Sequence, residues 1–336
     1  MTLRKSLVAL ATASLLAAIG QVQAAKHTMC VWDIAGQHGD GFNLMKDYKI
    51  AAMGWGEEFE LKAYTDEKIA AEDFKAGQCD AVLVTGIRGR LYNTFTGSLD
   101  SIGSQPSYAS VRLAHEVMSS PKLAAKMKSG PYEVVGIAPL GAAYLFVNDR
   151  KINNVGALSG KRITVLDFDK AQAKMVQNVG ASPVSSDITN FAGKFNNHSV
   201  DICAAPAAAY KALELYKGME PNGGVVRYAL AQVTLQMLIR GDKFAQNPGF
   251  GQKSRTWFFS KHDRLMDLIN KAEKEIDPKY WIEIPKADQA NYDELLRRSR
   301  IALRDEGIYN PETLTLLRKV RCKLDNSRAE CTEKTE

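Results

Sequence analysis

Short apolar runs alternate with amphipathic segments of about ten residues along the first part of the chain. The apolar runs predict strands at 28–34, 58–64 and 80–85, and the segments between them predict helices at 42–53 and 66–75. Buried strands separated by helices of this length are typical of a parallel, doubly wound sheet. In the usual order of such a unit the first strand lies between the other two.

The same alternation continues through the middle of the chain. It predicts strands at 132–139, 162–166, 183–184, 200–204 and 232–240, and helices at 108–127, 170–178 and 189–195. The strand at 232–240 alternates apolar and polar residues, and we expect it to return to the first unit. From residue 260 the chain is charged and amphipathic, which predicts long helices at 264–276 and 287–306.

These elements predict an α/β fold with two doubly wound lobes followed by C-terminal helices. A chain of 336 residues is long enough for two such units, at about 150 residues each. We expect the first lobe at residues 25–142 with a return segment at about 230–258, the second lobe at 143–229, and a helical C-terminal region at 259–336.

The N-terminal residues have the pattern of a secretory signal peptide. Arg4 and Lys5 precede an apolar run at 7–19, and the sequence VQA ends at Ala24. The run is shorter than the roughly 20 residues that a membrane-spanning helix needs. We therefore expect cleavage after Ala24 and export to the periplasm, with an uncleaved anchor as the alternative.

Composition and motifs narrow the class of protein. The chain has 44 Lys and Arg against 38 Asp and Glu, and the basic residues do not cluster between aromatic ones, so a nucleic-acid partner is not expected. The sequence contains no GxSxG, HExxH or phosphate-binding GKS/T motif, which argues against an enzyme. The five histidines are scattered and no CxxC is present, so neither a metal site nor a cofactor is expected.

The five cysteines predict two disulfides in an exported protein. Cys30 and Cys79 belong to strands that would be neighbours in the first sheet, within bridging distance of each other. Cys322 and Cys331 would close a short polar loop near the end of the chain. Cys203 is left in an apolar strand, where a buried, inert thiol is expected.

Several motifs carry a family resemblance that extends over nearly the whole mature chain. They are GQCDAV at 77–82, FVND at 146–149, ALSGKRI at 157–163, DKAQA at 169–173, ITNF at 188–191, KFNN at 194–197 and VDICAAPAAAY at 200–210. The chain resembles the AdeT-like solute-binding proteins, which are related to TRAP-type periplasmic solute-binding proteins. The resemblance implies a type II periplasmic-binding-protein fold.

The resemblance also implies a function. It points to a periplasmic protein that captures a small polar solute between two lobes by hinge closure, for TRAP-like transport through a membrane permease. Members of the AdeT-like family are associated with efflux and multidrug resistance. The alternative is therefore an orphan binding fold that acts as a periplasmic adaptor or accessory of an efflux system.

The chain departs from the TRAP pattern where that family holds its ligand. TRAP proteins for organic acids clamp a carboxylate with an arginine, and Thr164 occupies the matching position here. A second family arginine falls at Tyr144, and a Glu-Asn pair becomes Ala204-Ala205. A bidentate carboxylate clamp is therefore not expected at the usual place.

The remaining candidates are polar and aromatic residues near the carboxyl ends of strands, where open α/β sheets bind ligands. Aromatic rings there can stack on a ring or a cation. The candidate ligand-binding residues are Trp32, Asp33, Arg88, Tyr144, Thr164, Asp167, Phe168 and Asp187. They predict a polar solute, and the more specific hypothesis is a cationic or zwitterionic one. As alternatives, Asp169 and Asp187 can cap the helices that follow them, Asp33 and Asp167 can be caps as well, and Arg88 and Arg90 can be exposed rim residues.

Overall fold

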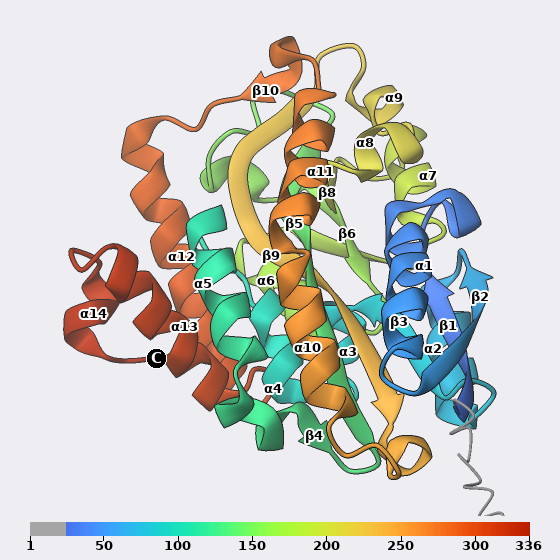
Figure 1. Ribbon diagram of the computed structural model, residues 1–336. Helices are drawn as coiled ribbons and strands as arrows, with labels where there is room; N and C mark the ends of the chain where they lie inside the picture. The colour runs from blue at the N-terminus through green and yellow to red at the C-terminus, as the bar shows by residue number, and fades with distance from the viewer. Residues whose placement is uncertain (1–24) are drawn as a thin grey trace, which may run out of the picture.

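A single mixed sheet organises the part of the chain that the computed structural model describes, residues 25–336; the predicted signal peptide lies outside it. The strand order is β2-β1-β3-β9-β5-β8-β6-β7, with β10 (Trp281–Ile282) beside β9 and β4 (Lys128–Ser129) beside β5. Helices pack on the sheet, so the fold class is α/β as predicted (Figure 1). The predicted lobe boundaries stay a prediction, because the sheet is continuous.

The first half of the sheet, β2-β1-β3, follows the predicted order. Its elements are β1 (Ala25–Trp32), α1 (Asp40–Met53), β2 (Glu57–Tyr64), α2 (Glu67–Ala76) and β3 (Ala81–Thr85). β1 pairs in parallel with both β2 and β3, and every residue of β3 is buried. The predicted disulfide between Cys30 and Cys79 is present, with a Cα–Cα distance of 5.8 Å. The side chain of Asp66 caps α2 by accepting from the N–H groups of Lys68 and Ile69.

Two long antiparallel strands, β5 (Tyr132–Val147) and β9 (Gly224–Arg240), run through the centre of the sheet. β9 pairs with β3 on one side, and β5 pairs with β8 on the other. The sequence predicted the second half of β9 and the first half of β5. The prediction for β5 ends early because Pro139 and Gly141 interrupt its apolar pattern. In the structure both lie at a register shift between β5 and β9, where an irregular ladder tolerates these residue types.

The second half of the sheet, β8-β6-β7, is parallel. Its elements are β6 (Arg162–Leu166), α6 (Lys170–Asn178), β7 (Ser182–Ser186), α7 (Phe191–Asn196), β8 (Ile202–Pro206) and the short helices α8 (Ala209–Ala212) and α9 (Tyr216–Met219). The predicted bounds of β6 and α6 are confirmed. Cys203 is a free, buried thiol in β8, as expected.

Further helices connect and cover the two halves. They are α3 (Gly86–Gly89), α4 (Thr94–Gly97), α5 (Tyr108–Ser119), α10 (Phe250–Ser260), α11 (His262–Lys274), α12 (Lys286–Asp305), α13 (Pro311–Leu324) and α14 (Ala329–Glu333). α5 is shorter than the predicted helix at 108–127, because the chain leaves the α conformation before Pro121 and continues as a 3-10 turn. The sequence reading missed α10, α13 and α14.

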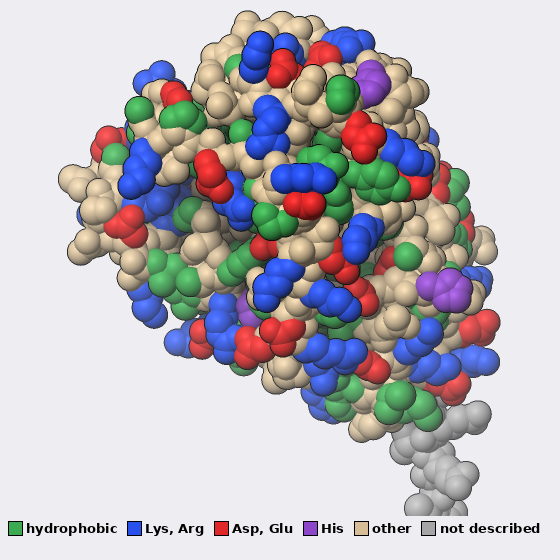
Figure 2. All heavy atoms as spheres, turned by 90° about the horizontal axis from the view of Figure 1, so that it is seen from above, with side chains coloured by type: hydrophobic (Ala, Val, Ile, Leu, Met, Phe, Trp, Pro, Cys, Tyr) green, Lys and Arg blue, Asp and Glu red, His purple; other side chains and the backbone are tan. Residues whose placement is uncertain are grey.

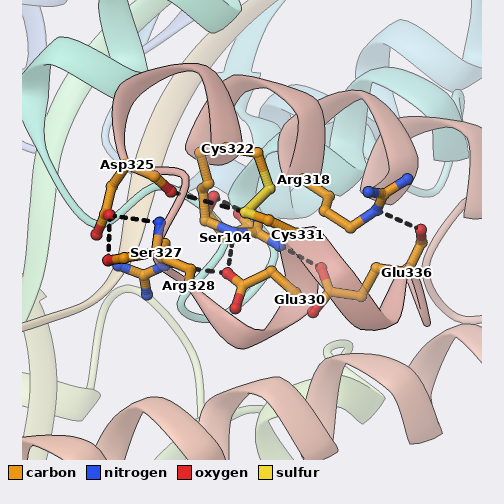
Figure 3. Close-up of a disulfide and its surroundings, with 10 residues drawn as sticks. Ser104, Arg318, Cys322, Asp325, Ser327, Arg328, Glu330, Cys331 and Glu336 are labelled. Carbon is orange, nitrogen blue, oxygen red and sulfur yellow. Dashed lines mark hydrogen bonds and ion pairs between the residues drawn. A yellow bond between two sulfur atoms is a disulfide. The ribbon is translucent and has the colours of Figure 1, made fainter.

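The C-terminal helices are tied together by the second predicted disulfide, Cys322–Cys331, and by buried ion pairs (Figure 3). Arg321 of α13 donates to Glu330 and Glu336 and to the carbonyl of Ser104. Since its side chain is fully buried, these contacts fix the last residues of the chain against α13. We call residues 325–336 the C-terminal segment.

The face of the molecule seen in Figure 2 carries charges of both signs. Figure 2 shows one face on which Lys and Arg side chains are interspersed with Asp and Glu, so that face carries no field of a single sign. Across residues 25–336, no helix combines the length and hydropathy needed to cross a membrane. The same residues contain no group of three potential metal ligands.

Candidate ligand-binding cleft

A cavity of about 160 Å³ lies where the two halves of the sheet meet. Trp32 and Thr85, at the carboxyl ends of β1 and β3, contribute to its wall from the first half. Thr164 of β6 and Ala205 of β8 contribute from the second half. Carboxyl ends of parallel strands are where open α/β sheets bind ligands, so the topology places a cavity at the expected edge.

The walls of this cavity are mostly apolar. β5, β6, β9 and α12 supply side chains such as Leu140, Leu145, Ile163, Val165, Leu230 and Leu296. Among the residues lining it, none is lysine, arginine or histidine. The cavity is therefore largely apolar, and its wall contains no cationic side chain.

Two carboxylates stand in this apolar wall. Asp100 is 3% exposed and accepts hydrogen bonds from the N–H and the hydroxyl of Thr234, at 3.1 and 2.7 Å. Burial raises the pKa of Asp100 to about 7, although the Thr234 bonds and nearby Arg90 act in the opposite direction. Asp169 accepts from the Arg90 guanidinium at 3.1 Å and from the N–H of Ala171 at 3.0 Å.

The two arginines that follow β3 are both engaged within the protein. Arg88 pairs with buried Glu67 at 3.0 Å, and its guanidinium lies 3.6 Å from the ring centre of Phe168. Arg90 pairs with Asp169 and lies over the ring of Tyr309. Since each arginine already has a carboxylate partner, neither is free to clamp an anionic ligand.

The predicted ligand-binding residues divide into those that line the cavity and those that do not. Trp32 and Thr164 line it. Arg88 and Phe168 contact each other instead and are absent from its wall. Asp167 is exposed and is likewise absent from the wall.

The predicted residues Asp33 and Tyr144 lie near a second cavity of about 290 Å³, which shares Trp32 with the first. Asp33 lines this second cavity, and its carboxylate accepts from the N–H groups of Ala35, Gly41 and Phe42, which caps the start of α1. Burial raises the pKa of Asp33, against the effect of these three bonds. The Tyr144 hydroxyl donates at 2.7 Å to Glu273, another residue of the second wall.

The capping alternative is confirmed for Asp169 and is wrong for Asp187, because the N-cap of α7 is Asn190. Asp169 is the N-cap of α6. Asp187 accepts from the N–H groups of Thr189 and Asn190, at 2.8 and 3.0 Å, in the turn before α7. The Asp187 carboxylate is thus held by its own backbone, and the hydrogen bonds from this turn lower its pKa in spite of partial burial.

Sequence reasoning missed the residues that give the cavity its polar character. Asp100 lies in a Gly- and Ser-rich stretch that reads as a loop, and Tyr292 lies in a helix that reads as amphipathic and exposed. The Tyr292 hydroxyl and the indole N–H of Trp32 are buried without a hydrogen-bond partner. Only the pairing of residues that are far apart in the sequence, such as Asp100 with Thr234, reveals these positions.

Comparison with known structures supports this view of the fold. The chain superimposes on a TRAP periplasmic solute-binding protein from Ralstonia eutropha with bound (S)-2-acetolactate, with a TM-score of 0.74 at 12% identity, covering 89% of this chain and 99% of that one. One from Desulfovibrio salexigens with bound orotic acid gives a TM-score of 0.70 at 15% identity, covering 89% and 99%. The predicted type II periplasmic-binding-protein fold is thus confirmed.

Sequence comparison identifies the family. The chain is 47% identical to the Probable solute-binding protein AdeT1 of Acinetobacter baumannii over 301 residues, which cover 90% of this chain and 98% of that protein. Residues 49–336 match the family model for Solute-binding protein AdeT 1/2. The chain therefore belongs to the AdeT 1/2 family of solute-binding proteins, as its motifs predicted.

Proposed function

We propose that this protein captures one small organic solute in the cleft and that its two halves close over the bound molecule. The observation that carries the proposal is the position of the cavity, at the carboxyl ends of strands from both halves of the sheet. A solute seated there touches both halves at once and therefore favours their approach. Closure would also exclude water and strengthen the polar contacts to the solute.

The cellular setting follows from the predicted signal peptide and from the family. Both support a periplasmic protein that hands its solute to a membrane permease. Two structurally similar proteins contain the organic acids acetolactate and orotic acid. The wall of the cavity described above contains no cationic side chain to grip an acid, so we propose a different class of solute for this chain.

The test begins with the protein as the cell makes it. The full chain is expressed with its own N-terminal segment, purified from the periplasm, and examined by native mass spectrometry for a bound small molecule. The released molecule is then added back in calorimetry and in small-angle scattering. We expect one molecule per chain and a smaller radius of gyration on binding.

A matched pair of variants locates the site. Ala231→Phe fills part of the cavity and should abolish binding, since Ala231 lies in its wall. Ala287→Phe adds the same ring to an exposed position of α12 and should leave binding unchanged. If no solute is found and the protein instead retains a membrane component in a pull-down, solute capture is wrong and the adaptor hypothesis replaces it.

A further inference from the structure

We infer that the cleft is built for a compact, largely apolar amine with one positive charge, whose ammonium group lies against Asp100. This inference names the class of solute and rests on the proposed function. It is carried by the charges around the cavity, by their burial and by the shape of the apolar wall.

The charged side chains in the cavity wall and next to it do not balance. Asp100 and Asp169 line the wall, and Arg90 pairs with Asp169. Arg88 and Glu67, the next charged residues along this edge, neutralise each other. With both aspartates ionised, the group therefore has one negative charge in excess.

Asp100 carries that excess. Within residues 25–336 it takes part in no ion pair, and its two hydrogen-bond donors both belong to the neutral residue Thr234. A buried carboxylate without a cationic partner is costly, so the free protein favours the protonated form. A ligand ammonium would provide both the missing charge and the missing donors, whereas a ligand carboxylate would add a second negative charge.

The rest of the cavity fits an apolar body of limited size. An apolar cavity of about 150 Å³ holds one benzene ring, and the volume here is about 160 Å³. The Tyr292 hydroxyl is a further polar group in this wall; it has no hydrogen-bond partner and lies on a residue that is 1% exposed. It can hydrogen-bond to one further polar atom of the solute, or to water carried in with it.

Three phenyl compounds with the same two-carbon linker and head groups of different charge test the inference. Phenethylamine, 2-phenylethanol and 3-phenylpropionate are titrated into the full mature chain in a calorimeter at pH 8. A charged hydrogen bond to a buried partner predicts that the amine binds ~10- to 100-fold more tightly than the alcohol. The carboxylate should bind most weakly. Carboxylate binding as tight as that of the amine would overturn the inference.

A variant pair assigns the effect to a residue. Asp100→Asn should remove the advantage of the amine over the alcohol, because the amide is neutral. Asp167→Asn, on an exposed residue outside the wall, removes the same charge from the protein and should change neither affinity. If Asp100→Asn binds the amine as tightly as the wild type does, the inference is wrong.

The pH dependence of the wild type gives the same answer without a variant, in case Asp100→Asn does not fold. As the pH falls from 8 to 6, protonation of Asp100, which faces Arg90, Asp169 and Thr234, should weaken binding of the amine and not of the alcohol. A flat profile for the amine contradicts the inference. If none of the probes binds and the purified protein releases a solute without an amino group, the amine class is wrong and solute capture stands. If no solute is found, both proposals fail.

Discussion

Replacing Glu336 by glutamine would test how the C-terminal segment is held on the fold. The Glu336 carboxylate bridges two arginines, accepting from Arg300 at 2.6 Å through one oxygen and from Arg321 through the other. The side chains of all three residues are at most 3% exposed. Arg321 also pairs with Glu330, which accepts from the partly exposed Arg328 as well, so Arg300 has only Glu336 as its carboxylate partner among the described residues.

The size of the effect follows from the burial of the cluster. Glutamine keeps the shape of the side chain but removes its charge, which leaves one buried arginine without a counter-ion. Removing one partner of a buried ion pair costs ~3–5 kcal/mol of unfolding free energy. The variant keeps the Cys322–Cys331 disulfide, so that cross-link is the same in both proteins and the difference measures the loss of the carboxylate and of the hydrogen bond that its second oxygen accepts.

The assay is urea unfolding at pH 7, followed by tryptophan fluorescence under oxidising conditions. Glu333→Gln is the matched control, because Glu333 lies in the same segment and pairs with Arg297 at a side-chain exposure of 46%. An exposed pair of this kind contributes at most ~1 kcal/mol. If the two variants lose equal stability, the buried cluster does not hold the C-terminal segment and the reasoning fails.

Three further predictions concern stability. The pKa of Asp100 is raised from 3.8 to about 7, so its carboxyl binds a proton more tightly in the folded state than in the unfolded one. Relative to Asp100→Asn, the unfolding free energy of the wild type should therefore fall by up to ~4 kcal/mol as the pH rises from about 4 to 7. If the unfolding free energies of the two proteins change in parallel over this range, the prediction is wrong. Asp33→Ala should cost ~1–2 kcal/mol in urea unfolding because it uncaps α1, while Asp33→Asn keeps an acceptor and most of the stability. In a thermal melt, Gly136→Ala should cost ~1–3 kcal/mol, because the added Cβ would lie 2.2 Å from the buried ring of Phe258. Gly193→Ala meets no atom within 4 Å in α7 and should be neutral or stabilising, so equal losses from the two glycine changes would refute the packing argument.

Local elements were predictable from the sequence because their signals are local. The bounds of β6 and α6 follow from an apolar run and from an amphipathic segment that starts after the capping residue Asp169. The pairing of Cys30 with Cys79 follows from the order of three parallel strands. The helices that were missed, such as α10, combine aromatic and polar residues without a clear stop signal.

The candidate site was predictable only in part. Thr164, which the comparison with the TRAP pattern singled out, lines the cavity; its role in binding stays a prediction. The sequence could not show that Arg88 pairs with Glu67, or that Asp33 is bonded to the start of α1. A charged residue near a strand end has many possible partners, and the sequence does not say which one it meets.

The sequence by itself determined the order of the main strands and of the helices that connect the parallel ones, the two disulfides and the family, because periodicity, capping and motif spacing act over a few residues. Only the tertiary structure decided which charges are neutralised and which are not. Asp100 meets Thr234 from 134 positions away, and Arg90 meets Asp169 from 79 positions away. Such contacts depend on how the two halves of the sheet pack together, so the chemistry of the cleft emerges only when the chain is folded.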